Sequence, residues 1–410
     1  MANSRSLLEK NINSIRTDCA ACGVCSVVCP KGCIKFRFNK GLGCYHIIVD
    51  DNECIGCGKC LQVCPIKKDE DSSDGIPFIG NYKKIFAAYS KDEAIRRESA
   101  SGGFITAFLC YLLEKGYADA ALVSKREGVT GMSFLATTKE DVISAKTSIY
   151  APVDYSKGIK ELTETGYNKI VVVGLPCHIH AISNLRRLNK RLDEKIVLMI
   201  SIVCGKTPTT KAYHYIAKKN GFDFGSIYDV CNRGNGWPGY MTIRHGNGEY
   251  KVPYRSKMSM GLVLSSPFLC NPGCLSCIDG VGMTADIVAC DAWNKKYTHS
   301  ESDGWNYVMA KSEKGLNFLE ADEMREYIHF ESETLNNFLC ANKRVIQKAQ
   351  TGSKLRLPVN RAKVLNYHLS LKQHIYVWMM KYYKEHAGFI SANMNDALLF
   401  LGKILNKLKE

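Results

Sequence analysis

Two cysteine runs near the N-terminus have the same spacing, and both end in a Cys-Pro pair. They are Cys19-x2-Cys22-x2-Cys25-x3-Cys29-Pro30 and Cys54-x2-Cys57-x2-Cys60-x3-Cys64-Pro65. A 4Fe-4S cube needs four thiolates at tetrahedral corners, and two-residue gaps let one tight loop place three of them around one cube. The doubled pattern therefore predicts two clusters and an electron-transfer function.

The fourth thiolate of each cube must come from outside its own loop. In two-cluster ferredoxins it is the last cysteine of the other run. The ligand sets predicted in this way are Cys19, Cys22, Cys25 and Cys64 for the first cluster, and Cys54, Cys57, Cys60 and Cys29 for the second. Structural zinc is the alternative, but zinc sites seldom take three closely spaced cysteines followed by Cys-Pro.

A later loop rich in Pro and Gly carries three more cysteines, Cys270, Cys274 and Cys277. Three closely spaced thiolates predict a third cluster, with zinc as the main alternative because this spacing is less diagnostic. The fourth ligand must be remote, and we predict Cys204 because it follows an apolar strand. The other candidates are Cys177, Cys231 and Cys290. Four further cysteines are predicted to be ordinary thiols: Cys33, Cys44, Cys110 and Cys340.

The central region alternates predicted strands and helices. Strands are predicted at 118–124, 169–174 and 196–203, with helices at 104–115, 178–188 and 209–219. This alternation predicts a mainly parallel sheet covered by helices, with ligands at the carboxyl ends of the strands. The small residues Ser101-Gly102-Gly103 precede the first of these helices, where backbone N–H groups can approach an anion. A plain helix cap is the alternative.

Cys177 lies at the start of the helix predicted at 178–188, directly after Pro176. The positive end of a helix dipole lowers the pKa of a thiol. We therefore predict Cys177 as a catalytic or cofactor-facing residue, with a buried and inert cysteine as the alternative.

The chain has 410 residues and a formal net charge of +15, most of which lies near its C-terminus. From residue 341 onward there are 13 Lys and Arg against 3 Asp and Glu. Three oxidised clusters would add about −2 each and leave the rest of the chain nearly neutral, so no nucleic-acid partner is predicted. The sequence shows no signal segment and no long apolar stretch, which favours the cytoplasm and disfavours disulfides.

The C-terminal region contains two predicted amphipathic helices, at 374–384 and 397–409, that combine lysines with aromatic or aliphatic residues. We expect them to pack on the body of the protein or on a partner. Peripheral contact with the inner face of a membrane is the alternative.

The ordered motifs over 82–321 resemble those of the family of coenzyme F420 hydrogenase/dehydrogenase beta subunits, preceded by a ferredoxin module. The matching pieces are Ser101-Gly102-Gly103, Ser148-Ile149-Tyr150, Gly174-Leu175-Pro176-Cys177, Cys204-Gly205, Arg233 with Gly236-Trp237, Cys270-x3-Cys274-x2-Cys277-x-Asp279, Ala285-Asp286-Ile287 with Asp291, Gly304-Trp305-Asn306 and Lys314-Gly315. Two positions depart from the family pattern, since His178 stands where glutamine is usual and Cys290 where glycine is usual.

The resemblance implies an iron-sulfur flavoprotein that binds FAD and converts between electron pairs and single electrons. The cofactor-binding residues it implies are Ser101, Gly102, Gly103, Ser148, Tyr150, Gly174, Pro176, Cys177, Arg233 and Asp291. It further implies coenzyme F420 as a candidate substrate, and a ferredoxin, another redox protein or an organic substrate as partner. An electron relay within a larger redox complex, with no substrate of its own, is the alternative function.

The predicted fold class is α+β and α/β. A small bacterial-ferredoxin-like domain occupies 10–68, followed by a linker at 69–81, a larger α/β flavin-binding and Fe-S domain at 82–340, and a basic helical extension at 341–410.

Overall fold

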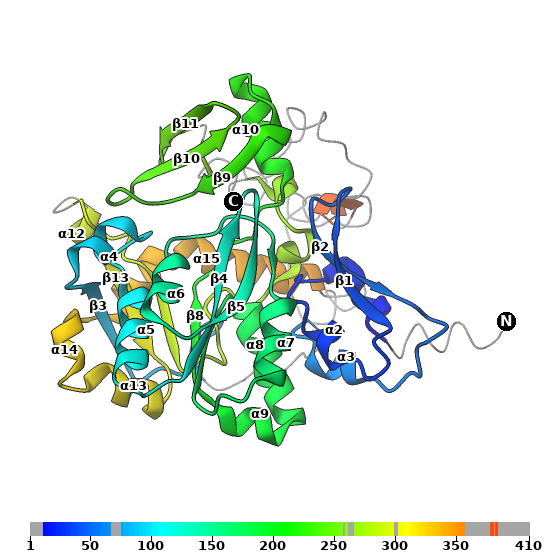
Figure 1. Ribbon diagram of the computed structural model, residues 1–410, viewed down its shortest axis with the longest axis horizontal. Helices are drawn as coiled ribbons and strands as arrows, with labels where there is room; N and C mark the ends of the chain where they lie inside the picture. The colour runs from blue at the N-terminus through cyan, green and yellow to red at the C-terminus, as the bar shows by residue number, and fades with distance from the viewer. Residues whose placement is uncertain are drawn as a thin grey trace.

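A nine-stranded mixed sheet forms the centre of the protein (Figure 1), with strand order β14-β3-β13-β12-β8-β7-β4-β5-β6. The computed structural model describes residues 11–66, 75–256, 259–260, 266–298, 302–356, 378–380 and 382–383. The strands are β3 (Lys84–Ser90), β4 (Ala120–Glu127), β5 (Thr130–Ala136), β6 (Val153–Asp154), β7 (Ile170–Gly174), β8 (Ile196–Ile202), β12 (Ile287–Asp291), β13 (Asn306–Ala310) and β14 (Ile328–Glu333).

The middle of this sheet is parallel, as the sequence predicts. β4, β7, β8 and β12 are neighbours in parallel register. Antiparallel strands flank them, with β5 on one side and β13, β3 and β14 on the other. The carboxyl ends of β7, β8 and β12 therefore meet at one edge of the sheet, which is where open α/β sheets bind ligands.

The sheet is buried on both faces, so its central strands are continuous apolar runs. Along β7, Ile170 and Val172 belong to one hydrophobic core, and Val171 and Val173 belong to the other. The first core includes residues of α7 (Ser156–Glu164), α8 (Pro176–Leu188) and α9 (Lys190–Lys195). The second includes residues of α4 (Glu93–Glu98), α5 (Phe104–Glu114), α6 (Lys139–Ser144), α13 (Glu313–Glu320) and α14 (Met324–Tyr327).

The N-terminal cysteine runs lie in a small module beside α7 and α8 (Figure 1). Its elements are η1 (Ile12–Asp18), α2 (Val24–Val28), the antiparallel pair β1 (Ile34–Asn39) and β2 (Cys44–Val49), and α3 (Lys59–Val63). The buried side chains of Val24, Leu61 and Val63 share one core with α7 and α8. The module is thus packed onto the large domain rather than tethered to it.

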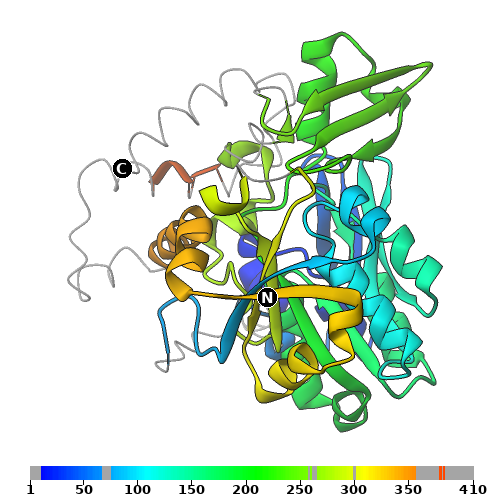
Figure 2. The same ribbon diagram turned by 90° about the vertical axis from the view of Figure 1, so that its left-hand side faces the viewer.

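A second, three-stranded sheet stands at one end of the large domain (Figure 2). It consists of β9 (Ile227–Cys231), β10 (Tyr240–His245) and β11 (Gly248–Pro253), and α10 (Lys211–Asn220) shares its core. Other short elements among the described residues are η2 (Phe224–Ser226), η3 (Pro267–Leu269), η4 (Pro272–Ser276) and α12 (Lys295–Thr298). The predicted fold class, with a small ferredoxin-like region, a larger α/β region and a helical C-terminal part, is confirmed.

The domain boundary predicted at residue 341 falls inside a helix. α15 (Leu335–Arg356) runs through that position and packs against η4. The predicted boundary lies after the end of the family resemblance. The helix nevertheless continues through residue 341, with Phe338 buried on one side of this position and Ala349 buried on the other. Of the predicted linker, residues 75–80 form a turn with a bridge between Ile76 and Gly80.

Part of the first predicted C-terminal amphipathic helix packs on the body of the protein. Met380 and Tyr383 are buried, and the Tyr383 hydroxyl donates to the Phe268 carbonyl at 2.8 Å. Trp378 and Tyr382 are 67% and 55% exposed. The second predicted helix, at 397–409, lies outside the described residues. Within the described ranges every helix is too short or too polar to span a bilayer.

Lys311 is a buried cation that makes stability depend on pH. Its side chain is 8% exposed and its ammonium donates to the Ile79 carbonyl, and burial lowers its pKa to about 8 from an ordinary 10.5. Between these values the unfolded chain holds a proton that the folded chain has released, so this group makes stability rise with pH.

Replacing Lys311 by methionine should remove that rise. Between pH 7.5 and pH 10, the free energy of unfolding should increase less in K311M than in wild type, by about 2 kcal/mol. Urea unfolding at the two pH values measures the difference. The exposed Lys91 provides the control, and a K311M response equal to that of K91M would contradict the assignment.

Candidate functional site

The first predicted ligand set is brought together in the structure. The charge of Cys64 acts on Cys19, Cys22 and Cys25, although Cys64 is far along the chain and follows α3. Burial raises the pKa of each of these three thiols, that of Cys19 to about 12. Buried thiols this near to one another are suited to holding a multi-atom iron-sulfur cube as thiolates, because the positive charge of the iron offsets the desolvation that otherwise disfavours thiolates.

The second set surrounds a small cavity of ≈ 20 Å³. Cys29, Cys54, Cys57 and Cys60 all line it, as predicted from the swap between runs. Cys33 lines it too, with its sulfur 3.3 Å from that of Cys29. The sequence predicts an ordinary thiol at Cys33 because this residue lies outside the spaced run, yet the fold makes it a fifth thiol of this site.

Iron content distinguishes the assigned ligands from the extra thiol. C64S should lose the first cluster and therefore about four irons per chain, because a cube cannot be held by three thiolates as firmly as by four. C33S should retain its iron, because Cys33 is not an assigned ligand. Iron and sulfide determination after anaerobic purification measures both variants. Equal iron loss in the two would contradict the assignment.

The third predicted set lies where β8 ends and η4 begins. Cys204 is close enough to Cys274 and Cys277 for their charges to interact, and Cys270 lies beside Cys274. Burial raises the pKa of Cys204 and of Cys270 to about 12. Across the described ranges, no three His, Cys, Asp or Glu side chains gather tightly enough to bind a lone metal ion.

Cys177 lies between the first and third sets. The charges of Cys22, Cys204, Cys274 and Cys277 all act on it. The sequence predicts that the start of the helix lowers the pKa of Cys177. In the structure, burial and these neighbouring sulfurs instead raise that pKa well above its usual value. Burial of the Cys177 thiol contributes most to this rise in pKa, and the neighbouring cysteines add to it.

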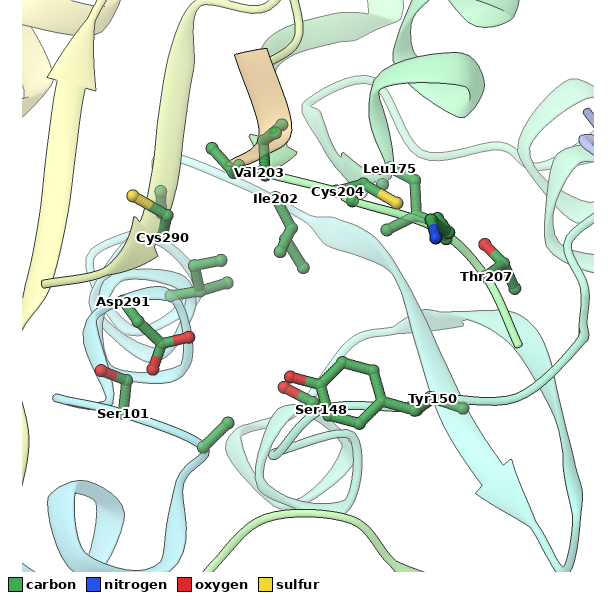
Figure 3. Close-up of a pocket in the computed structure, with 18 of the residues that line it drawn as sticks. Ser101, Ser148, Tyr150, Leu175, Ile202, Val203, Cys204, Thr207, Cys290 and Asp291 are labelled. Carbon is green, nitrogen blue, oxygen red and sulfur yellow. The ribbon is translucent and has the colours of Figure 1, made fainter. Parts of the chain in front are cut away.

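A cavity of ≈ 1550 Å³ opens at the carboxyl ends of β7, β8 and β12. Figure 3 shows Ser101 and Asp291 on one side of it, Cys204 and Thr207 on the opposite side, and Ser148 and Tyr150 between them. Residues Ala20 and Ala21 of the first cysteine run also line it. The cavity therefore reaches from the large sheet to both the first and the third predicted cluster.

The start of α5 borders this cavity. Gly103 precedes the helix with a φ of +75°. The first N–H of the helix, that of Phe104, donates to the side-chain oxygen of Asn306 at 3.1 Å. Ser101 donates its hydroxyl to the Trp305 carbonyl at 2.6 Å. A Cβ on Gly102 would lie 2.9 Å from the Ala88 carbonyl oxygen, so that glycine is required for close packing of the loop against β3. Ile105 and Thr106 of the same turn also line the cavity, and the N-terminal turn of a helix favours an anion.

A buried ion pair supports the wall on the Asp291 side. Arg233 is fully buried and its Nη2 lies 3.0 Å from Oδ1 of Asp291, which also accepts from the Trp237 indole at 2.9 Å. The guanidinium donates further to the carbonyls of Ala100 at 2.6 Å and Pro238 at 2.9 Å. Arg233 thus fixes three loops around the carboxylate that faces the cavity.

An aromatic wall adjoins this pair. The rings of Trp237 and Trp293 are 4.8 Å apart, those of Trp293 and Tyr254 6.3 Å, and those of Tyr254 and Tyr150 6.1 Å. The Arg255 guanidinium lies 5.2 Å from the Trp293 ring. Offset aromatic surfaces with nearby cations are suited to stacking a planar, electron-rich ring.

The structure separates the predicted cofactor residues into two groups. Those that line the cavity are Ser101, Gly103, Ser148, Tyr150, Gly174 and Asp291, together with the predicted metal ligand Cys204. Those that stand behind its lining are Gly102, Pro176, Cys177 and Arg233. The sequence patterns did not reveal Tyr254, Arg255, Trp293 and Lys348, which also line it; they come from separate segments and share no local pattern.

Known family models match both the N-terminal module and most of the large domain. The chain fits the model described as coenzyme F420 hydrogenase/dehydrogenase, beta subunit, with its N-terminal part over residues 85–160 and its C-terminal part over 167–335. Two 4Fe-4S dicluster models match residues 18–68 and 46–97. The chain belongs to the family of F420 hydrogenase/dehydrogenase beta subunits. Its N-terminal module is a 4Fe-4S dicluster domain.

Curated relatives carry names that link them to F420. One of the subunits of the F420H2 dehydrogenase of Methanosarcina mazei is 28% identical over 321 residues, which cover 75% of this chain and 83% of that protein. The coenzyme F420-dependent sulfite reductase of Methanocaldococcus jannaschii is 28% identical over 340 residues, 76% of this chain. The chain spans about half the length of this second relative, 47%.

A solved structure shares the fold. A chain of the F420-reducing [NiFe] hydrogenase complex from Methanosarcina barkeri superimposes with a TM-score of 0.55 at 21% identity, covering 72% of this chain and 98% of that one. The predicted family and fold are thus both confirmed.

Proposed function

We propose that this protein is an iron-sulfur flavoprotein oxidoreductase that passes electrons through FAD between 4Fe-4S clusters and a two-electron carrier. The observation that carries the proposal is the cavity, because it extends from the start of α5 to Cys204 and to Ala20 and Ala21 of the first cysteine run. A cofactor in that space would lie beside two clusters at once.

The residues present fit both groups. At ≈ 1550 Å³ the cavity exceeds the roughly 300–1,000 Å³ of ordinary small-ligand pockets, as a dinucleotide requires. The first turn of α5, where Ile105 and Thr106 line the cavity, offers the positive end of a helix to a pyrophosphate. The three cysteine sets offer the soft thiolates that Fe-S clusters take as ligands. When bound, FAD would supply the conversion between hydride-type pairs and single electrons.

The chain's own residues orient the cofactors and exclude water. Arg233 holds Asp291 at the cavity wall, and the Tyr150 hydroxyl lies 3.4 Å from the same guanidinium. The aromatic wall of Trp293, Tyr254 and Tyr150 offers a stacking surface. α15 closes the side of the cavity next to Cys204.

The two-electron carrier in this proposal is of the deazaflavin type, coenzyme F420, because several relatives are named as F420-dependent or F420-linked proteins. A ferredoxin or another redox protein is the proposed one-electron partner. The proposal places the protein in the cytoplasm, where thiolates stay reduced, and includes no nucleic-acid partner.

Anaerobic stopped-flow spectroscopy tests this function. Protein reduced with dithionite should reduce added F420, and the rate should fall at least tenfold after FAD is removed. Restoring FAD should restore the rate. Transfer at an unchanged rate without flavin would contradict the proposal.

The alternative is an electron relay within a larger complex, with no substrate of its own. Two relatives favour this alternative because they are named as subunits of larger enzymes, one of an F420H2 dehydrogenase and one of a coenzyme F420 hydrogenase. A relay would exchange electrons with a ferredoxin while leaving both F420 and organic acceptors unchanged, so the same stopped-flow experiment separates the two functions.

A further inference from the structure

Lys348 is a buried cation at the third cysteine set. This residue lies on α15, is only 9% exposed and lines the cavity. It forms a hydrogen bond with Cys277, and the charges of Cys274 and Cys204 also act on it. One lysine thus faces three of the four thiols assigned to the third cluster.

α15 is packed too closely on the cysteine loop for this contact to be incidental. A Cβ on Gly352 would lie 2.2 Å from the Cys277 carbonyl oxygen, and one on Gly280 would lie 2.3 Å from the Val345 side chain. On the same helix Asn342 is buried and its amide donates to the Cys290 sulfur at 3.3 Å. The helix therefore holds Lys348 in one place against the loop.

The charge of Lys348 is not balanced by a carboxylate. Among the described residues no ion pair joins it to Asp or Glu, and a second cation, Lys206, lies near it and near Cys270. A buried ammonium is costly unless a nearby negative charge compensates it. Neutral thiols supply none, whereas a 4Fe-4S cube with four thiolates carries about −2 when oxidised and about −3 when reduced.

The first cluster has the opposite surroundings. Asp18 adds negative charge beside Cys19, and cysteines are the other charged groups that act on Cys19, Cys22 and Cys25. Backbone N–H groups, among them that of Ala21, also bond to sulfurs of this set. Because reduction adds one negative charge to a cube, a buried cation favours the reduced form and a neighbouring carboxylate disfavours it. The side-chain charges beside the two sites therefore differ in sign, with a lysine at the third set and an aspartate at the first.

We propose that Lys348 is the fixed counter-charge of the third cluster and raises its reduction potential, so that, of the two clusters beside the flavin cavity, the third holds electrons more readily. This inference rests on the proposed function, because it assumes that the third set holds a 4Fe-4S cluster. It assigns a tuning role to α15, which begins at residue 335, where the match to the family model ends.

Anaerobic redox titration followed by electron paramagnetic resonance tests the role. The third cluster's signal is the one absent from C274S. At a fixed solution potential, K348M should lower the ratio of reduced to oxidised third cluster at least tenfold. This change corresponds to a reduction potential lower by about 59 mV for one electron. The signals of the other two clusters should not move. K348R should remain near wild type, and K343M, an exposed lysine of the same helix, should have no effect.

Each outcome decides the inference. An unchanged potential in K348M that still holds three clusters would overturn it. If K348M loses the third cluster while K348R keeps it, the requirement for a positive charge is supported; if both lose it, the role is one of packing and the inference is wrong. Wild-type protein with about eight irons but bound FAD would refute the third cluster and this inference while leaving the proposed function, and absence of FAD would refute the proposed function. A full complement with an unmoved potential would refute this inference alone.

Discussion

R233M should unfold with a free energy about 3 kcal/mol or more below that of wild type. Arg233 is fully buried and Asp291 has 21% of its side chain exposed, so removing the guanidinium leaves a largely buried carboxylate without its counter-charge. The carbonyls of Ala100 and Pro238 lose a donor as well. Loss of one partner of such a pair costs more than loss of the whole pair.

Urea unfolding of anaerobically prepared protein measures this effect. The control is R244M, because Arg244 pairs with Asp229 and Glu249 at the surface with 45% of its side chain exposed. That variant should lose less than about 1 kcal/mol. The double variant R233M/D291N should recover part of the loss, since it removes the orphaned charge. Equal destabilisation in R233M and R244M would contradict the structural role given to the buried pair.

C274S should lose the whole third cluster and keep the other two. Cys274 interacts with each of the other three assigned thiols, Cys204, Cys270 and Cys277. Its replacement therefore removes the central thiol of the set. Iron should fall from about twelve to about eight per chain. C340S, which changes an exposed cysteine, is the matched control and should retain all its iron.

The same measurement identifies the fourth ligand. The sequence-based prediction is Cys204, and the structure places Cys177 beside the same sulfurs. C204S should therefore lose four irons, whereas C177S should not. The reverse pattern would assign the role to Cys177. Retention of about twelve irons in C274S would contradict the third cluster.

The N-terminal ligand sets were predictable because they follow from spacing within short loops. The rule that each run lends its last cysteine to the other run placed Cys64 with Cys19 and Cys29 with Cys54, as the fold does. The parallel strands were predictable for a similar reason: β7 and β8 are buried on both faces and read as continuous apolar runs. Local pattern and local structure coincide in both cases.

The rest depends on contacts between distant segments. Cys33 joins the second cysteine set through the folding of the dicluster module itself. Cys177 meets Cys22 only because that module packs on α8, and no spacing rule reports either contact. Trp293 and Tyr254 become one wall through the docking of the three-stranded sheet. Gly102 carries a family motif yet serves packing against Ala88, so a motif glycine alone did not reveal whether it faces a ligand.

One anaerobic preparation of the full chain, assayed for iron, sulfide and released flavin, tests the proposed cofactor content without any variant. We predict about twelve irons, about twelve sulfides and one FAD per chain. Such a result would place a flavin and three clusters in a protein whose cavity adjoins two of the cysteine sets. About eight irons and no flavin, even after incubation with added FAD, would contradict the flavoprotein proposal and leave only the dicluster module.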